Sequence, residues 1–198
     1  MDEAGDPYVF EPWQTGDADA LMQLTDRLLR QCGIDYFLAF GTLLGAVREG
    51  NFIKGDLDID IIVTNEERLF ESLPFLYKKG LLINRIFPEE LYTFHSANRH
   101  GHIDLYVMKD LDKHHVTIQG HRQNRKYFKT ILPDGGGHTL AGKTYPCPAN
   151  PERLLIHWYG RNWRIPQDKQ ANINTWYETI LKYHRRVIRK AKKILRSL

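Results

Sequence analysis

Residues 39–63 read AFGTLLGAVREGNFIKGDLDIDIIV, and this stretch decides the fold. An apolar strand candidate at 34–40 precedes it and ends at Gly41. A short helical turn, TLLGAVR, follows, and a second strand candidate covers 57–63. That second strand begins with acids alternating with apolar residues and ends wholly apolar. Because a buried charge is costly unless something pairs with it, the acids of this strand require a partner.

The acids of this stretch, Asp56, Asp58 and Asp60, are spaced two residues apart. Side chains alternate between the two faces of a strand, so we expect the three carboxylates on one face and Ile59 and Ile61 in the core. Carboxylates so close together repel, and a divalent cation, which takes hard oxygen ligands, would keep them ionised. The alternative is a solvated strand end, which the apolar flanks disfavour.

A further acid, Asp104, lies in the later strand candidate HIDLYV. If the two strands are adjacent, Asp58, Asp60 and Asp104 meet at one centre, and we predict them as catalytic residues and as ligands of Mg²⁺ or Mn²⁺. Asp104 could instead accept a proton from an attacking hydroxyl. His102 shares a face with Asp104 and is predicted to contact substrate, with a surface or supporting histidine as the alternative.

A phosphate site is predicted beside these acids. Gly41 and Thr42 open the helical turn after the first strand, and backbone N–H groups at a helix N-terminus favour anions. Gly41 lets the backbone approach a phosphate, the Thr42 hydroxyl adds a hydrogen bond, and Arg48 supplies a positive charge. A simple helix cap is the alternative. Carboxylate-held cations beside a phosphate site indicate phosphoryl-transfer chemistry, because the cation neutralises charge on the group under attack.

Composition limits the class of protein. The chain has 198 residues, 42% of them hydrophobic and two of them cysteines, which indicates a globular protein without a disulfide scaffold. The sequence has neither a signal-peptide pattern at Met1 nor an apolar run of about 20 residues, so we expect a cytoplasmic protein. The net charge is +4, but residues 182–196 hold eight basic residues and no acid. The rest is acidic, so no nucleic-acid partner is expected.

The order of predicted elements is helix, strand, turn, strand, helix, several strands and then helices, which is typical of an α+β fold with a mixed sheet flanked by helices. Within it, Asp17 is predicted to cap a helix over 18–32, and Thr64 with Glu67 a second helix that Pro74 interrupts or kinks. A Rossmann fold is disfavoured, because GTLLG does not fit the G-x-G-x-x-G pattern.

We divide the chain into an N-terminal arm (1–16), a catalytic domain (17–170) and a C-terminal basic helix (171–198). The apolar residues of that last helix recur at helical spacing among basic ones. It is predicted either to lie on an anionic membrane surface, which would place the protein at the inner face of a membrane, or to pack on the domain with a solvated basic face.

Taken together, the motifs resemble the LicD family, which includes fukutin-like proteins. The family run reads G-T-L-L-G-x-x-R, then a loop, then F-I-x-W-D-D-D-I-D, against GTLLGAVR and FIKGDLDID here. HIDLYV resembles the family's later Ile-Asp strand, and YPCPANPERLLIHWYGRNWRIP its closing segment, so the resemblance spans 34–166. Two residues depart from the pattern: Gly55 stands where the family has Trp, and Leu57 replaces the middle aspartate.

The resemblance implies a nucleotidyltransferase-type fold and transfer of a phosphate-linked group, such as phosphocholine or ribitol phosphate, from a CDP-activated donor to a sugar hydroxyl of a glycan. By position it assigns the phosphate side to Gly41, Thr42 and Arg48, the metal pair to Asp58 and Asp60, the third acid to Asp104, and a substrate role to Asp56. Nucleotidyl transfer to a small molecule and a non-enzymatic nucleotide- or glycan-binding module are the alternatives. We interpret Tyr159 and Trp163 as core and turn residues.

Overall fold

The computed structural model describes Trp13 and residues 16–98, 100–132 and 137–166. They belong to two compact units, Met1–Arg161 and Asn162–Leu198, and of the second unit only 162–166 are described. The predicted basic helix at 171–198 and most of the predicted arm at 1–16 therefore lie outside the described residues. Within the described part of the chain, no helix combines the length and apolarity needed to cross a membrane.

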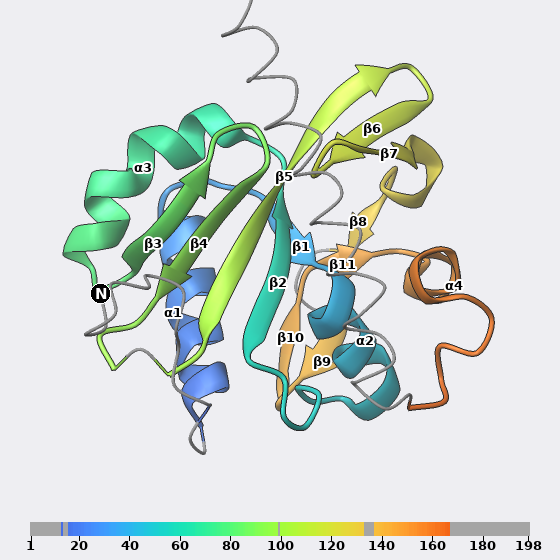
Figure 1. Ribbon diagram of the computed structural model, residues 1–198, viewed down its shortest axis with the longest axis horizontal. Helices are drawn as coiled ribbons and strands as arrows, with labels where there is room; N and C mark the ends of the chain where they lie inside the picture. The colour runs from blue at the N-terminus through green and yellow to red at the C-terminus, as the bar shows by residue number, and fades with distance from the viewer. Residues whose placement is uncertain (1–12, 14–15, 99, 133–136, 167–198) are drawn as a thin grey trace, which may run out of the picture. The chain divides into compact units, whose positions relative to one another are not determined.

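Four α-helices and eleven strands make up the first unit as described (Figure 1). The helices are α1 (Asp17–Gln31), α2 (Phe40–Glu49), α3 (Glu66–Lys78) and α4 (Pro151–Tyr159), with a short 3₁₀ turn at Arg125–Tyr127. The strands are β1 (Tyr36–Leu38), β2 (Asp58–Val63), β3 (Leu82–Phe87), β4 (Leu91–His95), β5 (His102–Asp112), β6 (His115–Ile118), β7 (His121–Asn124), β8 (Ile131–Leu132), β9 (His138–Leu140), β10 (Lys143–Tyr145) and β11 (Cys147–Pro148).

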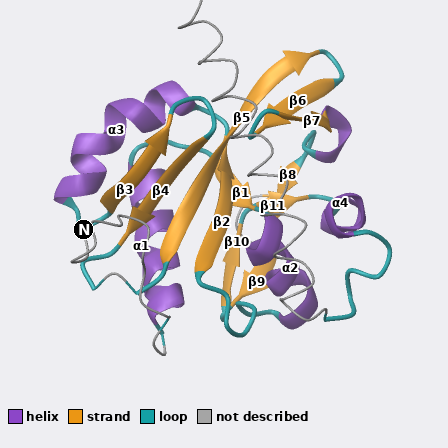
Figure 2. Ribbon diagram, in the orientation of Figure 1, coloured by secondary structure: helices purple, strands orange, loops and turns teal. Residues whose placement is uncertain are grey.

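The main sheet is mixed. Its strand order is β1-β2-β5-β4-β3, and the outer part of β5 continues into the β6–β7 hairpin. β2 and β5 are parallel, whereas the other neighbours in this sheet are antiparallel. Helices flank the sheet, with α1 packed on β5, and α2 in contact with both β2 and α4 (Figures 1 and 2). The predicted α+β fold with a mixed sheet is confirmed.

The core follows from the alternation in β2. Ile59 and Ile61 are fully buried, as their position on the face opposite the aspartates predicts. Their ladder partners on β5, Ile103 and Leu105, are also fully buried. Leu57, in contrast, precedes β2 and is 44% exposed, because the strand begins only at Asp58. Two parallel strands therefore supply the apolar centre that fixes the direction of the acids beside it.

The first strand is shorter than predicted. Of residues 34–40, only Tyr36–Leu38 pair with β2, and Phe40 already begins α2. Phe40 has a φ of 37°, in the left-handed region that non-glycine residues rarely adopt. Its ring packs against Tyr106 and Trp158, at centroid distances of 4.9 and 4.5 Å, and this packing offsets the strain. The abrupt turn from strand to helix places the first turn of α2 beside β2.

Both predicted helix caps are wrong. Gly16, with a φ of 87°, is the N-cap of α1, while Asp17 lies in the first turn, where it bonds the His100 imidazole at 2.8 Å. The N-cap of α3 is Asn65, whose side chain accepts a hydrogen bond from the Arg68 N–H at 2.9 Å. Asparagine and threonine are both good caps, so neighbouring candidates compete and sequence alone does not separate them.

The helix α3 also differs from expectation at its proline. Pro74 lies inside the helix, which runs on to Lys78 instead of ending before it. Leu69, Leu73 and Leu76 are buried on one side of α3. Burial of this apolar stripe offsets the backbone hydrogen bond that a proline removes.

Candidate functional site

The candidate site forms where the parallel strands β2 and β5 begin. In the ladder, Asp58 pairs with His102 and Asp60 with Asp104. Residues two apart on a strand share a face, so all four side chains project from the same side of the sheet. The structure thus brings together the three acids predicted as metal ligands and the histidine predicted beside them.

Asp104 is held from the neighbouring strands. The Thr93 hydroxyl on β4 donates to its Oδ1, and Arg85 Nη2 on β3 lies 3.5 Å from its Oδ2. Arg85 Nε also donates to Thr93 Oγ1 at 2.8 Å, which links the three side chains. Asp104 is 4% exposed, so these contacts compensate a buried carboxylate and fix its orientation. His102 Nε2 is 3.9 Å from the same Oδ2.

Asp60 is held from the other side, by α2. The Gly41 N–H donates to its Oδ2 at 3.0 Å, and the Tyr106 hydroxyl donates to its Oδ1 at 3.2 Å. Its own N–H donates to Thr42 Oγ1 at 2.8 Å. Gly41 and Thr42, predicted to contact a phosphate, therefore fasten the start of α2 to Asp60 in this structure. The first turn of the helix directs an N–H at a carboxylate of the chain itself.

Crowding of negative charge dominates the electrostatics here. Burial raises the pKa of Asp60 well above its ordinary value, and the carboxylates of Asp58, Asp104 and Asp56 raise it further. The hydrogen bond from Gly41 N–H lowers the pKa, but by less than these effects raise it. Burial and the same acids also raise the pKa of the Tyr106 phenol. The site is therefore an environment that a cation would stabilise.

Asp56 reaches the site from a turn instead of a strand. Its N–H donates to the Ile53 carbonyl at 3.0 Å, so it precedes β2 and is not carried by it. Its carboxylate still lies close to Asp60: a Cβ at Gly41 would be 3.0 Å from Asp56 Oδ2 and 3.2 Å from Asp60 Oδ2. The predicted clustering of these acids is confirmed, although its cause for Asp56 is the loop.

Glycine at position 45 makes room for that loop. A Cβ there would lie 2.5 Å from the Asn51 carbonyl oxygen and 3.2 Å from the backbone nitrogen of Ile53. Residues 51–53 can therefore cross directly over α2 on their way to Asp56. The second glycine of GTLLG thus serves the position of the acids.

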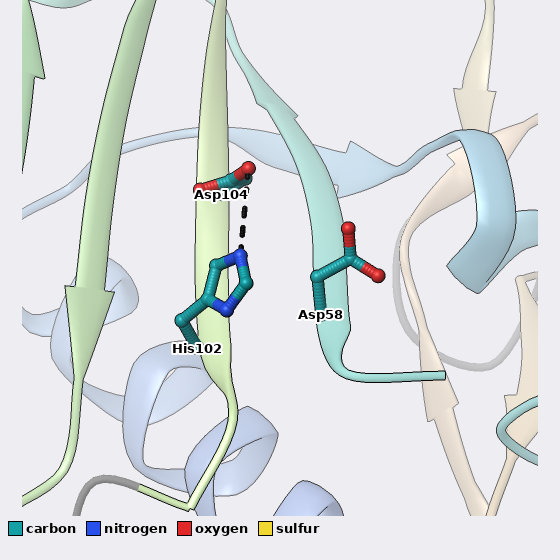
Figure 3. A group of neighbouring side chains, drawn as sticks. All are labelled: Asp58, His102 and Asp104. Atoms are coloured by element: carbon teal, nitrogen blue, oxygen red, sulfur yellow. Dashed lines mark ion pairs between the residues drawn. The ribbon is translucent and has the colours of Figure 1, made fainter. Parts of the chain in front are cut away.

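A metal-compatible group is present among the described residues. Asp58, His102 and Asp104 can each offer one ligand atom such that all of these atoms lie within 4.8 Å of one another (Figure 3). Adjacent ligands of a six-coordinate ion at about 2.1 Å lie roughly 3 Å apart, so modest side-chain rotation would close this group on a cation. Asp60, predicted as a ligand, is outside the group, and His102 is inside it.

Residues 33–150 match the family described as LicD/FKTN/FKRP, nucleotidyltransferase domain. This is more than half of the chain. The chain belongs to the LicD/FKTN/FKRP family. It is 26% identical over 149 residues to ribitol 5-phosphate transferase FKRP of Mus musculus, a match that covers 67% of this chain and 29% of that protein. The chain thus corresponds to less than a third of that relative.

Solved structures agree on the fold. The lincosamide antibiotic adenylyltransferase LnuA, bound to lincomycin, has a TM-score of 0.50 at 15% identity, over 70% of this chain and 85% of that one. ANT(2")-Ia, in complex with adenylyl-2"-tobramycin, has a TM-score of 0.50 at 13% identity, over 77% and 82%. Both are adenylyltransferases, and at these identities the likeness shows a nucleotidyltransferase-like fold.

One residue near the acids of this LicD-family chain was not predicted. Burial of the Tyr159 phenol raises its pKa, and the carboxylates of Asp60, Asp56 and Asp58 raise it further, while Arg48 lowers it. Tyr159 ends α4 and is 39% exposed, so its ring is accessible from solvent while its hydroxyl senses the acids. Sequence reasoning assigned it to the core. The aromatic-Gly pair in the closing motif was the signal that could have indicated it.

Arg48 lies at the opposite end of α2 from Gly41. Its Nε donates to Glu49 Oε1 at 2.9 Å, and its Nη2 also pairs with that oxygen. The predicted phosphate contact of Arg48 would require this exposed pair to open, which costs little because exposed ion pairs contribute about 0–1 kcal/mol. Its influence on Tyr159 puts its charge on the same side as the acids.

Proposed function

We propose that this chain is a metal-dependent phosphotransferase that moves a phosphate-linked group, such as phosphocholine or a polyol phosphate, from a CDP-activated donor to a sugar hydroxyl of a glycan. The observation that carries the proposal is the convergence of Asp58, His102 and Asp104 on one face of β2 and β5, inside the region that matches the family. The name of the FKRP relative, a ribitol 5-phosphate transferase, supports the kind of group transferred.

In this proposal Asp58, Asp104 and His102 hold the cation, which when bound neutralises negative charge on the phosphates. Thr93 and Arg85 keep the Asp104 carboxylate oriented toward it. Asp60 lies beneath this group and fixes the start of α2 through Gly41. The N–H groups at the start of α2, with Arg48 farther along, are the proposed contacts of the donor phosphates.

The proposed reaction forms a bond between the acceptor hydroxyl oxygen and the phosphorus that carries the transferred group. The bond from that phosphorus to the oxygen of the CMP moiety breaks, and CMP leaves with the electron pair. The hydroxyl proton passes to a carboxylate of the site. Asp60 is our candidate, because its raised pKa lets a carboxylate hold a proton near neutral pH. Asp56 is proposed to contact substrate.

The test is release of CMP from a panel of CDP-choline, CDP-ribitol and CDP-glycerol, with Mg²⁺ or Mn²⁺ and candidate sugar acceptors. We expect Asp58→Asn to reduce release about 10³-fold, because a ligand loss removes several kcal/mol of charge stabilisation. The matched control is Asp35→Asn, an exposed aspartate at the other end of the sheet, where its carbonyl accepts from the Thr64 N–H. This control should retain full activity.

Other results would redirect the proposal. Pyrophosphate release from a nucleoside triphosphate, without CMP release from any donor, would indicate nucleotidyl transfer to a small molecule. A rise in melting temperature with nucleotide or glycan, but no turnover of either donor class, would indicate a binding module. Equal CMP release by the native protein and by Asp58→Asn would remove the acids from the mechanism.

A further inference from the structure

The cation group contains an imidazole where the sequence predicts a third carboxylate. Asp60 accepts from Gly41 N–H and from the Tyr106 hydroxyl, and these contacts turn its oxygens away from the group formed by Asp58, His102 and Asp104. In Figure 3 the His102 ring lies between the strand positions of the two aspartates and faces Asp104. The donor set is therefore two oxygens and one nitrogen.

The position of this imidazole is set by the sheet. His102 is the first residue of β5 and pairs with Asp58 across the parallel ladder. Its N–H donates to the Leu57 carbonyl at 3.2 Å, which ties the start of β5 to the residue before Asp58. Its side chain is 15% exposed. A residue fixed by two strands in this way keeps its place when a ligand arrives, as a preorganised metal site requires.

The same register fixes its partner. Asp104 is bound on Oδ1 by Thr93, while its Oδ2 faces both Arg85 and His102. Oδ2 is thus the oxygen that can share a cation with the imidazole. An ion placed there takes one nitrogen and one oxygen from β5, and an oxygen from Asp58 on β2.

Nitrogen and oxygen donors rank cations differently. Mg²⁺ prefers oxygen ligands and is bound mainly by carboxylates, phosphates and water. Imidazole is a softer donor, and affinity for a site that contains it rises along the first transition series from Mn²⁺ upward. Replacing one carboxylate by a neutral imidazole also removes one negative charge, which weakens the site most for a hard ion such as Mg²⁺.

We propose that His102 is a direct ligand and that it gives this centre a preference for first-row transition-metal cations, with Mn²⁺ as the probe, over Mg²⁺. The inference deepens the proposed function, on which it rests only for the location of the cation. It names the residue that sets the identity of the ion.

The first test needs no variant. The native protein is stripped with chelator, loaded with Mn²⁺ and examined by pulsed electron paramagnetic resonance for coupling to a directly bound ¹⁴N nucleus. We expect that coupling, and we expect Mg²⁺ to displace Mn²⁺ only at about tenfold or greater excess. Failure of Mn²⁺ to bind, or binding without nitrogen coupling, would overturn the proposal.

The second test changes the ligand. His102→Asp restores an all-oxygen set and should lower the ratio of Mn²⁺ to Mg²⁺ affinity about tenfold, mainly through tighter Mg²⁺ binding. The matched control is His121→Asn, an exposed histidine on β7, which should leave the ratio and the nitrogen coupling unchanged. An unchanged ratio in His102→Asp would contradict the proposal.

These measurements are independent of catalysis. Nitrogen coupling without CMP release would keep the metal assignment and overturn the proposed donor class. CMP release without nitrogen coupling would keep the transferase and remove His102 from the metal. The two proposals therefore fail separately.

Discussion

The two ends of the parallel strands β2 and β5 hold acids in opposite electrostatic states. Where the strands begin, burial and three neighbouring carboxylates raise the pKa of Asp60. Where they end, Glu66 at the start of α3 is also partly buried, which raises its pKa. Hydrogen bonds from the Glu89 N–H, the Tyr92 hydroxyl and Lys109 outweigh this effect, and the pKa of Glu66 is held below its ordinary value.

The difference separates structural acids from functional ones. Tyr92 donates to Glu66 Oε1 at 2.9 Å, and Lys109 Nζ lies 3.2 Å from its Oε2, so ionised Glu66 stabilises the fold. Ionised Asp60 opposes folding, because its neighbours carry the same charge. A cavity of about 500 Å³ lies at the balanced end, with Glu66 and Lys109 in its lining. Charge imbalance, and not this cavity, therefore marks the candidate site.

The largest expected effect comes from Asp60→Asn. The amide keeps the shape of the carboxylate but removes its charge, so we expect transferase activity to fall about 10²- to 10³-fold. In chelator, the same change should raise stability by about 1 kcal/mol, or roughly 2–4 °C in Tm.

The sign of this stability effect depends on pH. A folded-state pKa above the unfolded value means that Asp60 favours folding at low pH and opposes it as pH rises. The gain in Tm of Asp60→Asn should therefore be larger at pH 8 than at pH 5. A variant that is less stable than the native protein at pH 8 would show that Asp60 is compensated like Glu66, and the contrast between the two ends would disappear.

Thr93→Val should have the next largest effect. It removes the hydroxyl that donates to Asp104 and accepts from Arg85. Loss of such a supporting contact weakens metal binding or activity about 10- to 100-fold, although Thr93 touches no substrate in our proposal. The measurement is Mn²⁺ affinity by titration, followed by turnover at saturating Mn²⁺.

A matched control separates this positioning effect from a general loss of stability. Thr25 is also fully buried, and its hydroxyl donates to the Leu21 carbonyl within α1 at 2.8 Å. Thr25→Val should lower Tm without changing Mn²⁺ affinity. Equal loss of affinity in both variants would mean that Thr93 acts only through the fold.

Much of this organisation could be predicted from the sequence. The two-residue period of Asp58 and Asp60 placed both on one face, and Asp104 and His102 followed by the same rule on a second strand. The adjacency of these strands was assumed from the shared chemistry, and their register confirmed it. Local patterns sufficed because each acid is carried by a strand with a fully buried opposite face.

What the sequence could not supply depended on distant contacts. Asp60 leaves the cation group because Gly41 and Tyr106, 19 and 46 residues away, take its oxygens. Asp56 was placed on a strand, because the turn to Ile53 has no strong signal in its residues. Tyr159 required the position of α4 beside α2, which no local period encodes. Partners far apart in sequence thus decided which predicted residues form the cation group.

The smallest expected effect tests the balanced end. Glu66→Gln keeps an oxygen acceptor but removes the charge that Lys109 and Tyr92 stabilise, so we expect a loss of about 1 kcal/mol at pH 7 and unchanged transferase activity. Because the folded-state pKa of Glu66 is lowered, its contribution is complete above the unfolded value of 4.5 and is lost as pH falls through the folded-state pKa. The difference in Tm between the native protein and the variant should thus shrink below about pH 4.5. Exposed Glu71→Gln on the same helix is the control and should show no difference at either pH. If Glu66→Gln instead matched the native protein at pH 7, ionisation of Glu66 would not stabilise the fold, and the two ends would differ in location only.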